Sequence, residues 1–212
     1  SIDSCGAKLA LADVLAWRAL QPARDAGFFD SEASQDGRLL KRISTVLTYF
    51  QKQLLIRVIP YAPVALIGVP YQCMSVTRDF LAIPHEIGHY VFRHGQVEKH
   101  VGIDLAWSHK EFFWKELDRR LPANQDKRWW AEEIFADVYG CLCAGPVLAL
   151  DFQDLQLEEC KEGFTRDDKE HPVPAVRPWI YLRVLNYLRD HFRLWPNSCA
   201  VIQTRWEQKF EQ

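Results

Sequence analysis

Two histidines one helical turn apart are the residues of this chain best placed for metal chemistry. They lie in the segment His85-Glu86-Ile87-Gly88-His89. Side chains at i and i+4 share one face of a helix, so both imidazoles can bind the same cation. Glu86 falls beside them, where it can take a proton from a water without binding the metal itself. Two nitrogen ligands and one free carboxylate predict the site of a zinc hydrolase.

The same segment has a simpler interpretation, a core helix whose two histidines form ordinary hydrogen bonds. Two features favour the metal site. Apolar residues flank the motif, including Phe80, Ile83 and Phe92, which predicts a buried and walled position. Gly88 lowers helix stability by about 1 kcal/mol relative to Ala, and its small size would let another element approach the metal-binding face.

A catalytic zinc needs a third protein ligand, and a downstream acidic cluster offers candidates. The segment reads Trp129-Trp130-Ala131-Glu132-Glu133-Ile134-Phe135-Ala136-Asp137. We expect Glu133 to bind the metal and Asp137, at i+4, to accept the outer N–H of a ligand histidine. Glu132 is the alternative ligand. The other interpretation is a solvated acidic face, which the apolar neighbours of these carboxylates disfavour.

These two segments together resemble the gluzincin metallopeptidases, specifically the HtpX-like and CAAX prenyl endopeptidase group and their small soluble relatives, the minigluzincins. A third segment, His171-Pro172-Val173-Pro174-Ala175-Val176-Arg177, is similar to the His-Pro-x-x-x-x-Arg element of that family. The resemblance covers residues 64–190. It implies one Zn²⁺ bound by the side chains of His85, His89 and Glu133, with Glu86 as the general base and Asp137 as a positioning partner.

The resemblance also implies that His171 and Arg177 face the scissile carbonyl. Histidine and arginine on a separate element could donate to the oxyanion of a tetrahedral intermediate. The simpler interpretation makes His171 a turn residue before a proline and Arg177 a surface charge. Tyr139 and Tyr181 are further candidate donors.

An apolar stretch before the motif is the expected substrate-binding strand. It lies between Pro63 and Pro70, and its short β-branched sequence favours a buried strand. In proteins of this type the strand before the metal-binding helix forms a sheet edge to which a peptide can add. The residues expected there are Leu66, Val69 and Tyr71. Cys73 follows them, and packing is the favoured role for its thiol.

Composition excludes several classes of protein. The chain has 212 residues, 48% of them hydrophobic, and a formal net charge of −2. These values predict one globular domain and disfavour disorder and whole-chain attraction to nucleic acid or anionic lipid. Prolines and an arginine interrupt the most apolar stretch, so no membrane-spanning helix is expected. The scattered cysteines favour reduced thiols in a cytoplasmic protein.

The expected fold is mostly α with a minor sheet (α+β), in which a zincin-like metal-binding helix packs on the sheet. The whole chain, 1–212, is predicted to form one peptidase domain. Its expected parts are an N-terminal helical region (1–55), a small sheet (56–73), the HExxH helix (77–94), a third-ligand helix (126–143) and C-terminal helices (174–211). The first region includes an amphipathic helix at 39–54, where apolar residues recur at intervals of three and four.

The sequence therefore predicts a zinc-dependent endopeptidase that acts on a protein or peptide substrate, with neither nucleic acid nor membrane as a partner. Two alternatives remain open. One is a metal-binding or regulatory module without catalytic activity, which has no evident use for Glu86. The other is a sensor-type peptidase that cuts a single protein, which would change the target and keep the mechanism.

Overall fold

The computed structural model describes residues 2–29, 45–52, 57–61, 64–97, 107–120, 128–157, 161–169 and 171–210. The fold is mostly helical with a small mixed sheet, as predicted. The α-helices in the described residues are α1 (Ile2–Asp25), α3 (Ile83–His94), α4 (His109–Arg120), α5 (Arg128–Ala144), α6 (Pro146–Leu157), α7 (Lys161–Phe164), α8 (Arg177–Phe192) and α9 (Ser198–Phe210). The strands are β1 (Thr45–Gln51), β2 (Arg57–Tyr61), β3 (Val64–Pro70), β4 (Gln96–Val97) and β5 (Trp107–Ser108).

The main sheet has the strand order β1-β3-β2. β2 and β3 form an antiparallel pair in which Ile59 lies opposite Leu66. β1 pairs with β3 in parallel, with Leu47 opposite Leu66. The expectation that β3 forms a free sheet edge is therefore wrong, because β3 is the central strand and β2 is the edge strand on one side.

The predicted helix at 39–54 is also wrong over its described part, residues 45–52, because β1 occupies most of that span. Its sequence, TVLTYFQ, is rich in β-branched and aromatic residues, which favour strands. Thr48 is buried, and both its N–H and its hydroxyl donate to the carboxylate of Asp13 on α1. These contacts attach the strand to α1, and such long-range contacts override a helical spacing of apolar residues in a short segment.

The helix that carries the HExxH segment begins at Ile83, later than the predicted start at residue 77. Residues Thr77–Ala82 form a 3-10 helix (η2), preceded by a second one, η1 (Tyr71–Met74). α3 follows, with Pro84 in its first turn, where the missing N–H is tolerated. Gly95 has φ −70° and ψ 144°, so the chain leaves the helix in an extended conformation.

The C-terminal half follows the predicted pattern with two differences. The third-ligand helix, predicted at 126–143, is α5, and Gly145 with φ 64° separates it from α6. The C-terminal helices, predicted from residue 174, begin only at Arg177 with α8, which has Pro178 in its first turn. Between α6 and α8, in a region to which no helix was assigned, lies α7, whose Phe164 is buried against the ring of Trp206.

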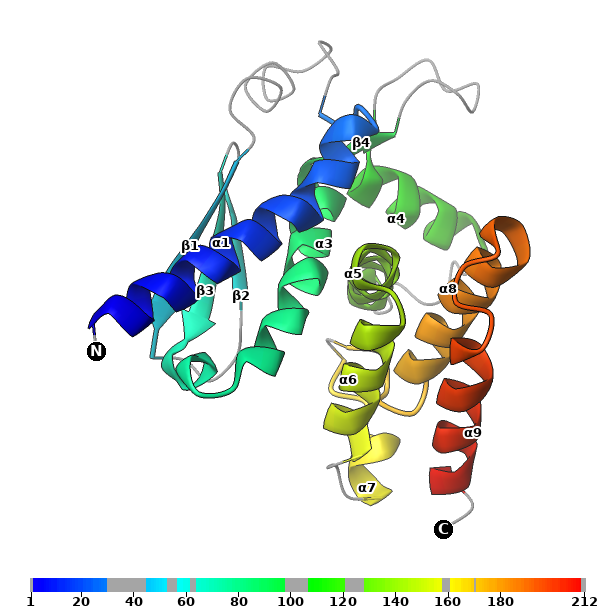
Figure 1. The fold of residues 1–212 in the computed structure, drawn as a ribbon. Helices are drawn as coiled ribbons and strands as arrows, with labels where there is room; N and C mark the ends of the chain where they lie inside the picture. Colours follow the sequence, from blue (N-terminus) through cyan, green and yellow to red (C-terminus); the bar gives the residue numbers. More distant parts are fainter. Residues whose placement is uncertain are drawn as a thin grey trace.

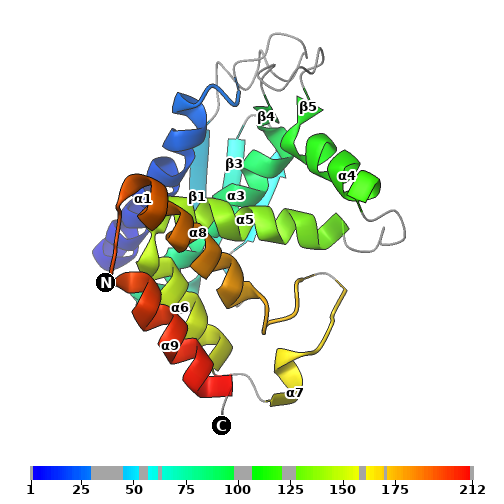
Figure 2. The ribbon, with the colours of Figure 1, turned by 90° about the vertical axis from the view of Figure 1, so that its right-hand side faces the viewer.

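Two hydrophobic clusters fill the protein on either side of the α3–α5 pair. One joins α1, the sheet and α3, and includes Leu20, Ile67 and Ile87. The other joins the end of α5 to α6, α8 and α9, and includes Leu148 and Leu185. In Figure 1 α1 and the sheet lie on the α3 side, and the C-terminal helices lie on the α5 side; Figure 2 shows the same order from the right.

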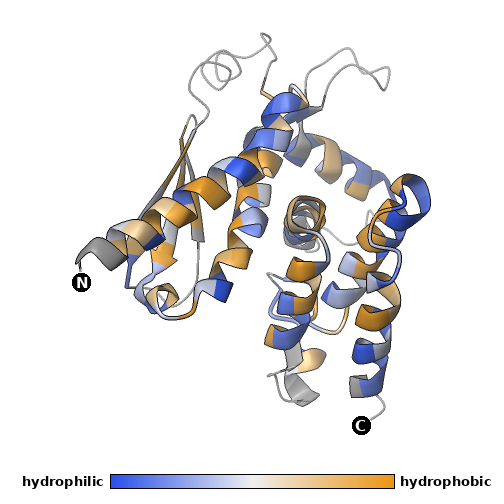
Figure 3. Cartoon of the chain, viewed as in Figure 1, coloured by the Kyte–Doolittle hydropathy of each residue, from blue (hydrophilic) through white to orange (hydrophobic). Residues whose placement is uncertain are grey.

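The long helices carry apolar and polar residues together, as expected for helices that bury one face (Figure 3). Among the described residues, no helix is both long enough and apolar enough for a membrane crossing.

Candidate metal centre

Close packing of α3 on α5 brings the two predicted ligand segments together. A Cβ added at Gly88 would lie 2.7 Å from the Cα of Ala136 on α5. On the other helix, a Cβ added at Gly140 would lie 3.1 Å from the backbone nitrogen of His85. Each helix thus has a glycine where the other approaches. The expectation that Gly88 lets another element come close is confirmed, and that element carries Glu133.

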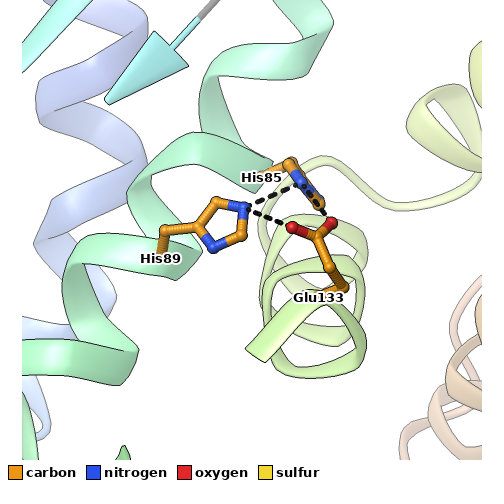
Figure 4. Close-up of side chains that lie close together, drawn as sticks. All are labelled: His85, His89 and Glu133. Atoms are coloured by element: carbon orange, nitrogen blue, oxygen red, sulfur yellow. Dashed lines mark hydrogen bonds and ion pairs between the residues drawn. The ribbon is translucent and has the colours of Figure 1, made fainter. Parts of the chain in front are cut away.

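His85, His89 and Glu133 converge at this contact, with their side chains pointing toward one another (Figure 4). The Nε2 atoms of the two imidazoles are 3.2 Å apart. The carboxylate of Glu133 lies 3.5 Å from Nε2 of His85 and 3.4 Å from Nε2 of His89. Each of the three side chains is 13% exposed, so the group is largely buried but reaches the surface.

The spacing of these atoms suits a tetrahedral cation. Metal–ligand distances of about 2.0–2.1 Å for zinc place neighbouring ligand atoms about 3.3 Å apart in a tetrahedron. The two Nε2 atoms, 3.2 Å apart, lie close to that value, and each has one oxygen of Glu133 at a similar distance, Oε2 at 3.5 Å from His85 and Oε1 at 3.4 Å from His89. Two imidazoles and one carboxylate also match the donor set of catalytic zinc sites, which leave a fourth position open. The residues present therefore fit a metal of this kind.

The outer nitrogen of His85 faces a buried network. Its Nδ1 lies 3.0 Å from Oδ1 of Asp137, the residue predicted to occupy this position. Arg177 donates from Nε and Nη2 to the two oxygens of that carboxylate, at 2.8 and 2.7 Å. The hydroxyl of Tyr181 also donates to Oδ1, at 2.7 Å. Asp137 is fully buried, and these partners compensate the loss of its hydration.

The outer nitrogen of His89 has a carboxylate partner that sequence reasoning missed. Oε1 of Glu132 lies 3.1 Å from Nδ1 of His89 and accepts a 2.8 Å hydrogen bond from Nε of Arg93. Glu132, the alternative third ligand, thus contacts the far side of the ring, and the group that could hold a metal ion comprises His85, His89 and Glu133. Two sequence signals for this contact existed: Arg93 stands at i+4 from His89, and Glu132 precedes the ligand.

Electrostatics at the site favour a cation. Around two imidazoles, three carboxylates (Glu132, Glu133, Asp137) face two guanidinium groups (Arg93, Arg177). Neutral imidazoles therefore leave one negative charge uncompensated.

The pKa shifts follow from this charge balance. Burial opposes protonation of His85, but Asp137 and Glu133 outweigh it and raise the pKa of the imidazole to about 10. Burial likewise opposes ionisation of Glu133, but His85, His89 and Arg177 lower its pKa to about 2. Arg177 and His85 hold the pKa of the buried Asp137 well below its usual range. Without a metal, a proton on His85 supplies the positive charge that the carboxylates stabilise.

Glu86 lies on the sheet side of α3. Its Oε2 accepts a 2.8 Å hydrogen bond from the backbone N–H of Val58 on the edge strand β2. This contact orients the carboxylate and attaches α3 to the sheet. The side chains of these two consecutive residues of α3 therefore contact different elements, His85 contacting α5 and Glu86 contacting β2.

The two residues of the third segment occupy different positions. Nε2 of His171 lies 3.8 Å from Oε1 of Glu133, and its Nδ1 lies 2.8 Å from Asp168. Its side chain is 45% exposed, so it stands at the surface beside the ligand group. Arg177 is buried, and its donors reach Asp137 and, at 3.5 Å, Glu133. These contacts favour a positioning role for Arg177 over direct contact with a substrate.

The residues predicted to bind the substrate are not members of this group. Val69 is buried, whereas Tyr71 is exposed and stacks on Phe50 of β1. Leu66 and Val69 lie on the central strand β3 and so are not at a sheet edge, whereas Tyr71 lies in η1, beyond the strand.

The other candidates take part in packing. The hydroxyl of Tyr139 donates a hydrogen bond to the backbone carbonyl of Ala19, and that of Tyr181 donates to Asp137. Both hydroxyls therefore have partners inside the protein. Cys73 is buried with its thiol next to Asp79.

Comparison of the chain with protein-family models, curated proteins and solved structures finds no match in any of the three.

Proposed function

We propose that this chain is a zinc-dependent endopeptidase of the gluzincin type, with a zincin-like arrangement of α3 beside a small sheet. The single observation that carries the proposal is the convergence of two imidazole nitrogens and one carboxylate at separations suited to a tetrahedral metal. The HExxH, Glu-x-x-Ala-Asp and His-Pro segments support the same assignment, because their residues meet at or beside this group.

In this proposal His85, His89 and Glu133 hold one zinc ion. Bound zinc would supply Lewis-acid chemistry, polarising the scissile carbonyl and lowering the pKa of a water. Glu86 takes a proton from the attacking water and passes it to the leaving amine. Its Oε2 is held by the N–H of Val58, so the carboxylate keeps a fixed orientation while the proton moves.

His171 is the candidate donor to the oxyanion. It is exposed beside Glu133, and Asp168 at its Nδ1 would fix the ring with Nε2 directed toward the reacting carbonyl. Arg177 acts through Asp137 and Glu133 by keeping both carboxylates in place. The substrate would be a protein or peptide, and its approach to the sheet would be along β2.

One observation favours a second candidate, a metal-binding module without catalytic activity. The hydrogen bond from Val58 gives Glu86 a structural use, joining α3 to the sheet edge. In that case the carboxylate would be retained for folding, and the metal would stabilise the α3–α5 contact.

Glu86→Gln separates the two candidates. The amide keeps an oxygen that accepts from Val58 and loses the ability to take a proton. For an endopeptidase we expect zinc content near that of the wild type and a fall in cleavage of an unfolded, fluorescently labelled protein of about 10²- to 10⁴-fold.

Glu207→Gln, an exposed carboxylate on α9, is the matched control and should leave cleavage unchanged. Zinc uptake by the wild type without any cleavage would favour the structural module. Equal cleavage by wild type and Glu86→Gln would refute the proposed role of Glu86.

A further inference from the structure

The carboxylate of Glu132 has no role in the mechanism above, yet it is one of the few buried acidic groups in the described residues. It is 5% exposed and lies on the second turn of α5, immediately before the ligand Glu133. Consecutive helix residues point about 100° apart. The two carboxylates accordingly reach opposite sides of the same ring, Glu133 at Nε2 of His89 and Glu132 at its Nδ1.

Arg93 completes this arrangement from the other helix. It stands one turn beyond His89 on α3 and donates from Nε to the same oxygen of Glu132 that faces Nδ1 of the ring. A buried carboxylate without a cationic partner is strongly unfavourable, so Arg93 makes the buried position of Glu132 possible. Its side chain is 39% exposed, which allows it to be replaced without opening the core.

The arrangement repeats the one on the other ligand. His85 contacts Asp137, and Asp137 is held by Arg177. His89 contacts Glu132, which is held by Arg93. Each imidazole thus contacts a carboxylate that is in turn bound by a guanidinium group. The chain from His85 lies inside the core, and the chain from His89 ends near the surface.

We infer that Glu132 and Arg93 are positioning residues of the metal centre, which hold His89 with a proton on Nδ1 and a free lone pair on Nε2. The inference rests on the proposed metal centre. A carboxylate at the outer nitrogen of a ligand histidine fixes the ring orientation and tautomer and increases its basicity toward the metal. Glu132 therefore acts on metal affinity through His89, and Arg93 acts through Glu132.

The test compares zinc dissociation constants, measured by competition with a chromophoric chelator, for the full chain and its Glu132→Gln, Glu132→Ala and Arg93→Gln variants. Loss of such a partner lowers metal affinity by about 10- to 100-fold. We expect the largest loss for Glu132→Ala, and smaller losses for Glu132→Gln, which keeps an acceptor oxygen, and for Arg93→Gln. Because Arg93 acts through Glu132, Arg93→Gln should add little in the Glu132→Ala background.

The visible absorption of bound Co²⁺ provides a readout that a purely structural role would not change. A rotated His89 ring alters the ligand geometry, so the spectrum of the Glu132 variants should shift. Glu116→Gln and Arg119→Gln, which break an exposed pair of the same residue types on α4, are the matched controls. Both should retain wild-type affinity and spectrum.

The outcomes separate this inference from the proposed function. Wild-type zinc affinity and an unshifted Co²⁺ spectrum in Glu132→Gln and Arg93→Gln would overturn the positioning role and leave the metal centre intact. A wild-type chain that binds neither metal would overturn the metal centre and this inference together.

Discussion

Substitution of Gly88 by alanine tests whether the close contact between α3 and α5 creates the proposed metal centre. The added Cβ would lie 2.7 Å from the Cα of Ala136, whereas ordinary contacts begin at 3.4 Å. The two helices would have to separate by about 0.7 Å, because the opposing atom belongs to the backbone and cannot rotate away. Ala136 lies between Glu133 and Asp137, so this shift carries both carboxylates away from the histidines.

Two opposing effects determine the stability of Gly88→Ala. Alanine favours a helix interior over glycine by about 1 kcal/mol. Overpacking of a close contact costs about 1–3 kcal/mol. The expected net loss in free energy of unfolding is therefore about 0–2 kcal/mol, small enough for the variant to fold.

The effect on metal binding should be larger than the effect on folding. Metal–ligand distances tolerate deviations of only about 0.2 Å, so a displacement of about 0.7 Å lowers affinity, on the order of 10- to 100-fold. The assay is zinc competition titration of the folded protein, with urea denaturation of the zinc-free protein alongside it.

Gly6→Ala on α1 is the matched control. Its Cβ would meet no atom within 4 Å, so the change should stabilise the protein by up to about 1 kcal/mol and leave zinc affinity unaltered. If Gly88→Ala behaved in the same way, with greater stability and wild-type affinity, the contact would not determine the site geometry.

Two further predictions concern protonation and the buried ion pair. The pKa of His85, raised to about 10 in the metal-free protein, means that zinc must displace a proton from this ring at neutral pH. Zinc affinity should therefore rise about tenfold per pH unit between pH 7 and 9, and an affinity independent of pH in chelator competition over this range would contradict the charge balance described above. Arg177→Leu leaves the carboxylate of Asp137 buried without its guanidinium partner, which should lower the free energy of unfolding by about 3–5 kcal/mol. Urea denaturation of the zinc-free protein measures this loss, and an unchanged midpoint would argue that water or a rearranged side chain replaces the arginine.

The residues of the proposed metal site could be predicted because short segments of the sequence determine which side chains share a helix face. His85 and His89 on one helix, like Glu133 and Asp137 on another, are placed by the i,i+4 geometry alone. The contact between the two helices depends on tertiary packing, and Gly88 was the feature of the sequence that indicated a close approach. The roles of Glu132 and Arg93 depend on how α5 is rotated about its own axis. The spacing of apolar residues predicts this rotation only approximately, with an error larger than the width of one side chain.

One misassigned segment produced the main error in the sheet. Val46, Leu47 and Phe50 have a spacing that fits a helix, yet these residues form β1 and pair with β3. With β1 assigned to a helix, β3 would have had a free edge. Strand order depends on contacts between distant segments, here Thr48 with Asp13 of α1, and apolar periodicity contains no information about it.

The edge position of β2 changes how an extended substrate could bind. N–H groups on one side of a strand alternate with those on the other, so Val58 and Pro60 both face away from β3. The N–H of Val58 is already donated to Glu86, and proline has none. This edge therefore offers carbonyl acceptors but few N–H donors. A lack of donors at an edge disfavours the unwanted addition of another strand. A peptide lying here would gain only part of a β ladder, and we expect side-chain contacts near the metal centre to contribute more to substrate selection than main-chain pairing.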